Sequence, residues 1–100
     1  MARQERQNGW CVYYLKKRNK IQRIGKGPYY HSEDDMLAYL ENRYGKRRYW
    51  TNFSYVGPFY NEEDAYDVED EAIERYKRGH GGKLPPYNRA RGGGGGRSEY

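Results

Sequence analysis

The chain is poor in cysteine and in long apolar segments, and both shortages limit what it can be. Its 100 residues include one cysteine and two histidines, which are too few for a disulfide framework or for a four-ligand zinc site. No apolar run approaches the ~20 residues that a membrane-spanning helix needs, and the polar N-terminus gives no indication of a signal peptide. We therefore expect a reducing, cytoplasmic location and no membrane partner.

Apolar residues are also scarce, at 35% of the chain, whereas aromatic residues are abundant. The sequence holds 13 tyrosines, whose rings can fill a small core while their hydroxyls stay hydrogen-bonded. One hundred residues allow one small domain with a thin core. We expect this domain over residues 10–88, between a flexible basic N-terminus, 1–9, and a flexible Gly/Arg-rich tail, 89–100.

Charge is unevenly distributed along the chain. The formal net charge is +5, which favours a polyanionic partner such as nucleic acid. Residues 1–60 hold 12 Lys and Arg against 5 Asp and Glu, whereas residues 61–74 hold 8 acids and no Lys or Arg. The basic residues interleaved with aromatic ones are typical of nucleic-acid surfaces; they are Lys16, Lys17, Arg18, Lys20, Lys46, Arg47 and Arg48. The alternative is that these charges only keep the protein soluble.

The hydrophobic pattern predicts a small α+β domain with a three-stranded, mainly antiparallel sheet flanked by helices. The predicted strands are 10–15, 21–25 and 52–57, and the predicted helices are 33–44 and 62–78. The first two strands form a hairpin with a cationic turn. Ser32 and Asn61 precede acidic first turns and are suited to cap the two helices. Gly45 ends the first helix, and residues 83–88 are expected to pack back on the sheet.

One carboxylate stands out in the second predicted helix. Its apolar stripe has a period of 3.6 residues and consists of Ala65, Val68, Ala72, Ile73 and Tyr76. Glu69 lies inside this stripe, where a carboxylate is costly unless it is paired, hydrogen-bonded or bound to a cation. Two interpretations stay open at this point, a divalent metal ligand or a buried carboxylate held by tyrosine hydroxyls.

Several short motifs occur in an order and spacing that resemble the GIY-YIG nuclease family. They are Cys11-Val12-Tyr13, Arg23-Ile24-Gly25 followed by Lys26-Gly27, then Ala65, Glu69 and Ile73 at intervals of four, and Tyr87-Asn88. The resemblance covers roughly four-fifths of the chain. Arg23 stands where the family has its second tyrosine, and His31 stands near the place of the family's helix arginine.

This resemblance implies a metal-dependent endonuclease that hydrolyses nucleic-acid phosphodiesters with a single Mg²⁺ or Mn²⁺ ion. It implies Glu69 as the metal ligand, Tyr13 as the residue that positions water, and Lys26 as a phosphate contact. Arg23 and His31 are candidates for the remaining positive charge, and Gly25 and Asn88 for structural support. DNA is favoured over RNA as the substrate, and a protein partner is expected to supply specificity.

Structural interpretations compete with each of these roles. Tyr13 is also an ordinary strand aromatic, and Lys26 and His31 are also ordinary loop residues. A chain that has lost catalysis would lack the second tyrosine and the helix arginine as well, and would remain a nucleic-acid-binding protein on the same scaffold. A third possibility is a small regulator that binds another protein through its acidic helix.

Overall fold

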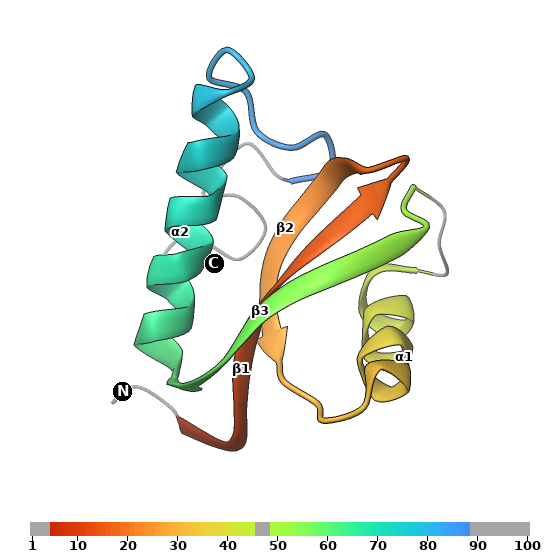
Figure 1. Ribbon diagram of the computed structural model, residues 1–100, viewed down its shortest axis with the longest axis vertical. Helices are drawn as coiled ribbons and strands as arrows, with labels where there is room; N and C mark the ends of the chain where they lie inside the picture. Colours follow the sequence, from red (N-terminus) through yellow and green to blue (C-terminus); the bar gives the residue numbers. More distant parts are fainter. Residues whose placement is uncertain (1–4, 46–48, 89–100) are drawn as a thin grey trace.

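The computed structural model describes residues 5–45 and 49–88, which form one antiparallel sheet and two helices (Figure 1). The elements follow in the order β1 (Glu5–Lys17), β2 (Lys20–Pro28), α1 (Glu33–Tyr44), β3 (Asn52–Asn61) and α2 (Glu62–Arg78). The strand order is β2-β1-β3, so β1 is central and antiparallel to both neighbours. The predicted α+β architecture is confirmed. Neither helix in these residues is long and apolar enough to cross a membrane.

The local signals for helix ends and turns are confirmed. The Ser32 hydroxyl accepts hydrogen bonds from the backbone N–H groups of Asp34 and Asp35, at 3.1 and 3.4 Å. The Asn61 side chain accepts one from the N–H of Glu63 at 2.8 Å. Arg18 and Asn19 have φ values of 55° and 63°, as a two-residue turn needs when it follows the twist of its strands. The hairpin therefore ends in a tight turn with basic residues on both sides.

All three strands are longer than predicted. β2 runs through Gly25 and Gly27, which were expected to end it, as far as Pro28. β1 begins at Glu5, so residues 5–9, predicted as flexible, belong to the sheet, where Glu5 pairs with Asn61. β3 continues through Gly57 to Asn61, although Gly57-Pro58 was expected to interrupt or end it. The register of β1 against β3 shifts between Trp10 and Val12, which absorbs this irregularity. Residues 1–4, the basic run 46–48 and the tail 89–100 lie outside the described residues.

The side chains of β1 alternate between two buried layers. One layer faces α1 and consists of Cys11, Tyr13, Leu15, Met36, Leu40 and Trp50. The other faces α2 and consists of Val12, Ile24, Ala72 and Ile73. Figure 1 shows the two helices on either side of the strands. Neighbouring residues of the central strand therefore point into different cores.

The segment after α2 packs against β2, as predicted. The backbone N–H of Tyr87 donates to the Gln22 carbonyl at 2.9 Å. The Asn88 side chain accepts from the N–H of Ile24 and donates to its carbonyl, each at 2.9 Å. Asn88 is buried, and its amide pairs with the outer edge of β2 as another strand would. This contact closes the domain.

We predict that Asn88→Ala destabilises the fold by ~2 kcal/mol, because it leaves two buried backbone groups of Ile24 without their partners. Urea denaturation of the wild type and the variant measures this loss. Asn52→Ala, at an exposed position of β3, is the matched control. An equal effect of both substitutions would show that the Asn88 pairing contributes nothing.

Candidate functional site

Tyr13 lies in the core beneath α1 rather than in an open site. Its side chain is 1% exposed, and its hydroxyl donates to the Pro28 carbonyl. Its ring packs against Tyr39 and Phe53, with centroids 6.0 and 6.1 Å away. Burial, and then the Cys11 side chain, raise the pKa of Tyr13 far above its ordinary value. In this conformation the hydroxyl is a structural donor and is poorly placed to activate water.

Arg23 is also held by structural contacts. Its Nη1 donates to the Tyr87 carbonyl at 2.8 Å, and its guanidinium lies 4.7 Å from the centre of the Tyr44 ring. Gly25 allows this ring to approach, because a Cβ at Gly25 would lie 2.9 Å from the Tyr44 hydroxyl. Arg23 therefore joins β2, α1 and the closing segment.

Lys26 lies on the opposite face of the sheet, under the start of α2. Its Nζ forms an ion pair with Glu62 at 3.0 Å, and the two side chains are 11% and 18% exposed. The same Nζ lies 3.9 Å from the Trp10 ring centre and 4.8 Å from that of Tyr66. The ammonium group is thus enclosed by a carboxylate and two aromatic faces, which leaves little of it for a phosphate.

Glu69 is fully buried on the stripe of α2 that faces the sheet. Mg²⁺ keeps several water ligands and usually takes one or two carboxylates, so its site must be open to solvent. Glu69, at 0% exposure, offers no such open site in this conformation. A Mg²⁺ or Mn²⁺ ion at Glu69 stays a prediction.

The structure does not bring the predicted catalytic residues together. Tyr13 and Arg23 lie on the α1 face, whereas Lys26 and Glu69 lie on the α2 face. His31 is exposed just before α1, with its ring 5.3 Å from that of Tyr29. The sheet thus separates residues that the resemblance assigns to one reaction centre.

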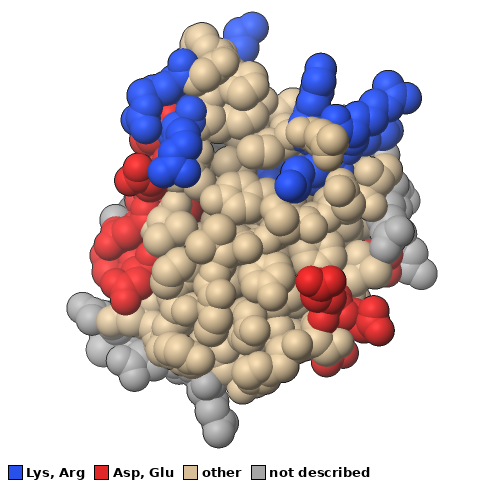
Figure 2. Space-filling view, in the orientation of Figure 1, with Lys and Arg blue, Asp and Glu red and all other residues tan. Residues whose placement is uncertain are grey.

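The cationic residues do gather at one end of the molecule (Figure 2). The β1–β2 turn supplies Lys17, Arg18 and Lys20, all exposed, and the half-buried Lys16. The last turn of α2 adds Arg75, Lys77 and Arg78. The acids in the first turns of both helices lie away from this end in Figure 2, whereas Glu71 and Glu74 pair with Arg75 and Lys77 beside it. We call residues 16–20 the cationic tip. The predicted contacts Lys46, Arg47 and Arg48 lie outside the described residues.

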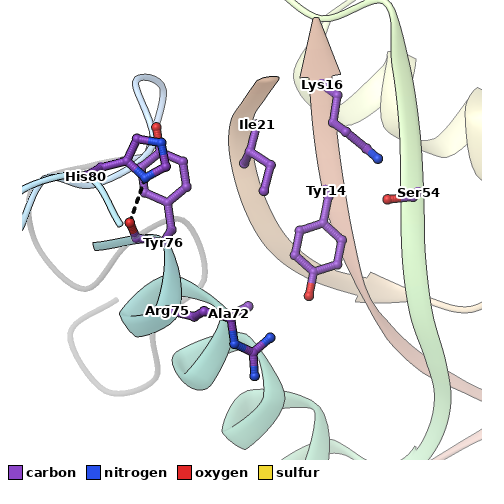
Figure 3. A pocket seen from close by; sticks show the side chains of 8 residues that line it. All are labelled: Tyr14, Lys16, Ile21, Ser54, Ala72, Arg75, Tyr76 and His80. Carbon is purple, nitrogen blue, oxygen red and sulfur yellow. Dashed lines mark hydrogen bonds between the residues drawn. The ribbon is translucent and has the colours of Figure 1, made fainter. Parts of the chain in front are cut away.

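A pocket of about 370 Å³ lies beside the cationic tip, between α2 and the sheet (Figure 3). The sheet contributes Tyr14, Lys16, Ile21 and Ser54 to its lining, and the helix side contributes Ala72, Arg75, Tyr76 and His80. A second pocket of similar volume shares Ile21, Tyr76 and His80 and extends to Asn19 and Lys20. The sequence analysis missed this site. Ala72 and Tyr76 lie on one face of α2, four residues apart, but His80 follows the end of the helix at Arg78 and joins them only through the turn there.

No protein-family model, curated protein or solved structure matches this chain. The GIY-YIG resemblance therefore stays a hypothesis that depends on the motifs alone.

We predict that millimolar Mg²⁺ or Mn²⁺ leaves the melting temperature of the wild type unchanged, because a ligand stabilises only a native state that binds it. Differential scanning fluorimetry measures this, together with cleavage of plasmid DNA and structured RNA. A rise in melting temperature that Glu69→Gln abolishes, and that Glu74→Gln on the same helix retains, would place a metal at Glu69 and contradict the burial argument.

We also predict that stability falls as the pH rises above ~10, where tyrosines of the unfolded chain ionise. Burial raises the pKa of Tyr13, and it raises the pKa of Tyr39 to about 12. The folded state therefore binds more protons than the unfolded state in this range, so its stability decreases with pH. Urea midpoints at pH ~8 and ~11 test this. The decrease should be smaller in Tyr13→Phe than in Tyr60→Phe, which changes an exposed tyrosine.

Proposed function

We propose that the chain is a nucleic-acid-binding protein on a GIY-YIG-like scaffold whose catalytic positions serve structural contacts. The observation that carries this proposal is the separation of charge along the molecule (Figure 2). The cationic tip and the basic last turn of α2 lie at one end, and the acidic first turns lie away from it. The electric field of such a charge distribution attracts a polyanion and orients it toward the cationic end of the molecule.

The tip is suited to phosphate contacts because of how it is built. Lys17 and Lys20 pair across the end of the hairpin, and the left-handed turn residues Arg18 and Asn19 hold them close together. The three basic side chains at this turn are exposed, so binding a phosphate requires no core residue to move. Contacts of this kind position a nucleic acid without reading its sequence.

The endonuclease predicted from the sequence stays a prediction, with metal binding and cleavage as its test. DNA as the preferred nucleic acid, a specificity partner and a cytoplasmic location also stay predictions. They are compatible with a small binding protein whose surface offers general phosphate contacts.

We predict that neutralising the tip weakens nucleic-acid binding and its dependence on salt. The variant Lys17→Gln, Arg18→Asn, Lys20→Gln removes three cations, and asparagine suits the left-handed conformation at residue 18. The slope of log K against log salt should flatten by up to about 3 for duplex DNA, since each neutralised phosphate contributes ~0.9. Fluorescence anisotropy over a salt series measures both quantities.

A charge-balanced variant is the control. Adding Glu33→Gln, Asp34→Asn and Asp35→Asn to the tip variant restores the formal net charge of +5 without restoring the tip. Binding should stay weak in this variant, because location rather than net charge determines it. Full recovery would contradict a localised interface. A wild type that binds no nucleic acid at low salt would overturn the proposal and favour the protein-binding regulator.

A further inference from the structure

The pocket between α2 and the sheet combines aromatic, cationic and polar groups, and phosphate binding at the cationic tip does not require this combination. Figure 3 shows Tyr14, Lys16 and Ser54 on the sheet side and the Tyr76–His80 pair on the helix side. Its volume is about 370 Å³, which falls within the usual range for small-ligand sites. The pocket adjoins the cationic tip, since Lys16 belongs to both.

The Tyr76–His80 pair forms a preorganised aromatic platform. The two rings stack with centroids 3.7 Å apart and planes 3° from parallel. His80 Nδ1 lies 2.8 Å from the Tyr76 carbonyl oxygen; because a carbonyl only accepts, Nδ1 carries the proton. This bond holds the exposed imidazole in place. Both rings line both pockets, so the pair stands between them.

Cations approach the pocket from its two walls. Lys16 comes from β1 and Arg75 from α2. Arg75 pairs with Glu71 at 3.2 Å, but these side chains are 67% and 61% exposed, and exposed ion pairs are weak enough to exchange partners. Burial raises the pKa of Tyr14 and the nearby Arg75 charge opposes that rise, which agrees with their positions in Figure 3.

An aromatic platform, an apolar floor and two flanking cations together suit a ligand that carries both a flat ring and a negative charge. Ile21 and Ala72 supply the apolar contact, and the hydroxyls of Tyr14 and Ser54 offer hydrogen bonds. A nucleotide has this combination, and its base stacks on aromatic side chains whatever its identity. A base paired inside a duplex presents no free face, so the fitting polymer is single-stranded.

We propose that this pocket binds one nucleotide of a single-stranded nucleic acid, with the base against the Tyr76–His80 pair and the phosphate between Lys16 and Arg75. The inference rests on the proposed function and adds to it a preference for single strands. The second pocket, which reaches Asn19 and Lys20, continues the path of the strand toward the cationic tip.

Two variants test the pocket while leaving every cation in place. His80→Ala removes the exposed ring of the platform, and Ser54→Trp fills the pocket from the edge strand β3. Each should weaken binding of a short single-stranded oligothymidylate at least about fivefold, the lower range for loss of one stacked base. Binding of duplex DNA of equal length should stay unchanged, because it depends on the tip. Fluorescence anisotropy at a fixed salt concentration measures both.

Tyr60 supplies matched controls on the same strand. It is 55% exposed and lies outside both pockets. Tyr60→Ala removes an exposed ring and Tyr60→Trp adds bulk, and neither should alter oligothymidylate binding. Urea denaturation establishes that every variant is folded. Amide chemical shifts of the wild type, titrated with thymidine monophosphate, should move at Tyr14, Ser54 and Tyr76.

The outcomes separate this inference from the function on which it rests. If both pocket variants bind oligothymidylate as the wild type does, while the tip variant loses binding, the pocket proposal is overturned and the nucleic-acid-binding function stands. If wild type and pocket variants bind duplex and single strand equally, the single-strand preference is wrong. If the wild type binds neither, both proposals fail together.

Discussion

The burial of both faces of β1 is the constraint on which the rest of the structure depends. Val12 and Tyr13 are adjacent in the central strand, and both are inaccessible to solvent or nearly so. Because successive strand side chains point to opposite faces, each face needs its own cover, and α1 and α2 supply one each. A thin core of this kind uses tyrosine rings where larger domains use aliphatic residues. It also divides any set of functional residues on these strands into two groups.

The helices could be predicted from the sequence because their ends depend on neighbouring residues, whereas the placement of the candidate site residues depends on how the strands pair. The limits of both helices follow from neighbouring residues, since Ser32 and Asn61 bond backbone groups two or three positions away. The start of β1 at Glu5 depends instead on pairing with Asn61, at the end of β3. No local pattern contains that information. Asn88 falls between these two cases. The Tyr87-Asn88 motif was recognisable in the sequence, but Ile24 as the hydrogen-bond partner of Asn88 was not.

Side-chain roles were least predictable where they depend on contacts distant in sequence. The helical period correctly placed Glu69 in a buried stripe, yet burial alone does not determine what a carboxylate does. Lys26 is enclosed by Trp10, Tyr66 and Glu62 from two other elements, and its position between two glycines in the sequence did not indicate these contacts. Tyr76 was assigned to the core stripe, and its stacking with His80 required knowing that the chain turns immediately after α2.

In the proposed binding of a single-stranded nucleic acid, the cationic tip and the aromatic pocket act over different distances and have distinct parts. Attraction by exposed cations extends about 8 Å at physiological ionic strength and weakens as salt is added. Stacking and burial in a pocket act only at contact and depend little on salt. In this proposal a polyanion is attracted to this end before any base is recognised. Selection between single and double strands must then come from the contact that only an unpaired base can make, and the Tyr76–His80 platform lies where that contact would form.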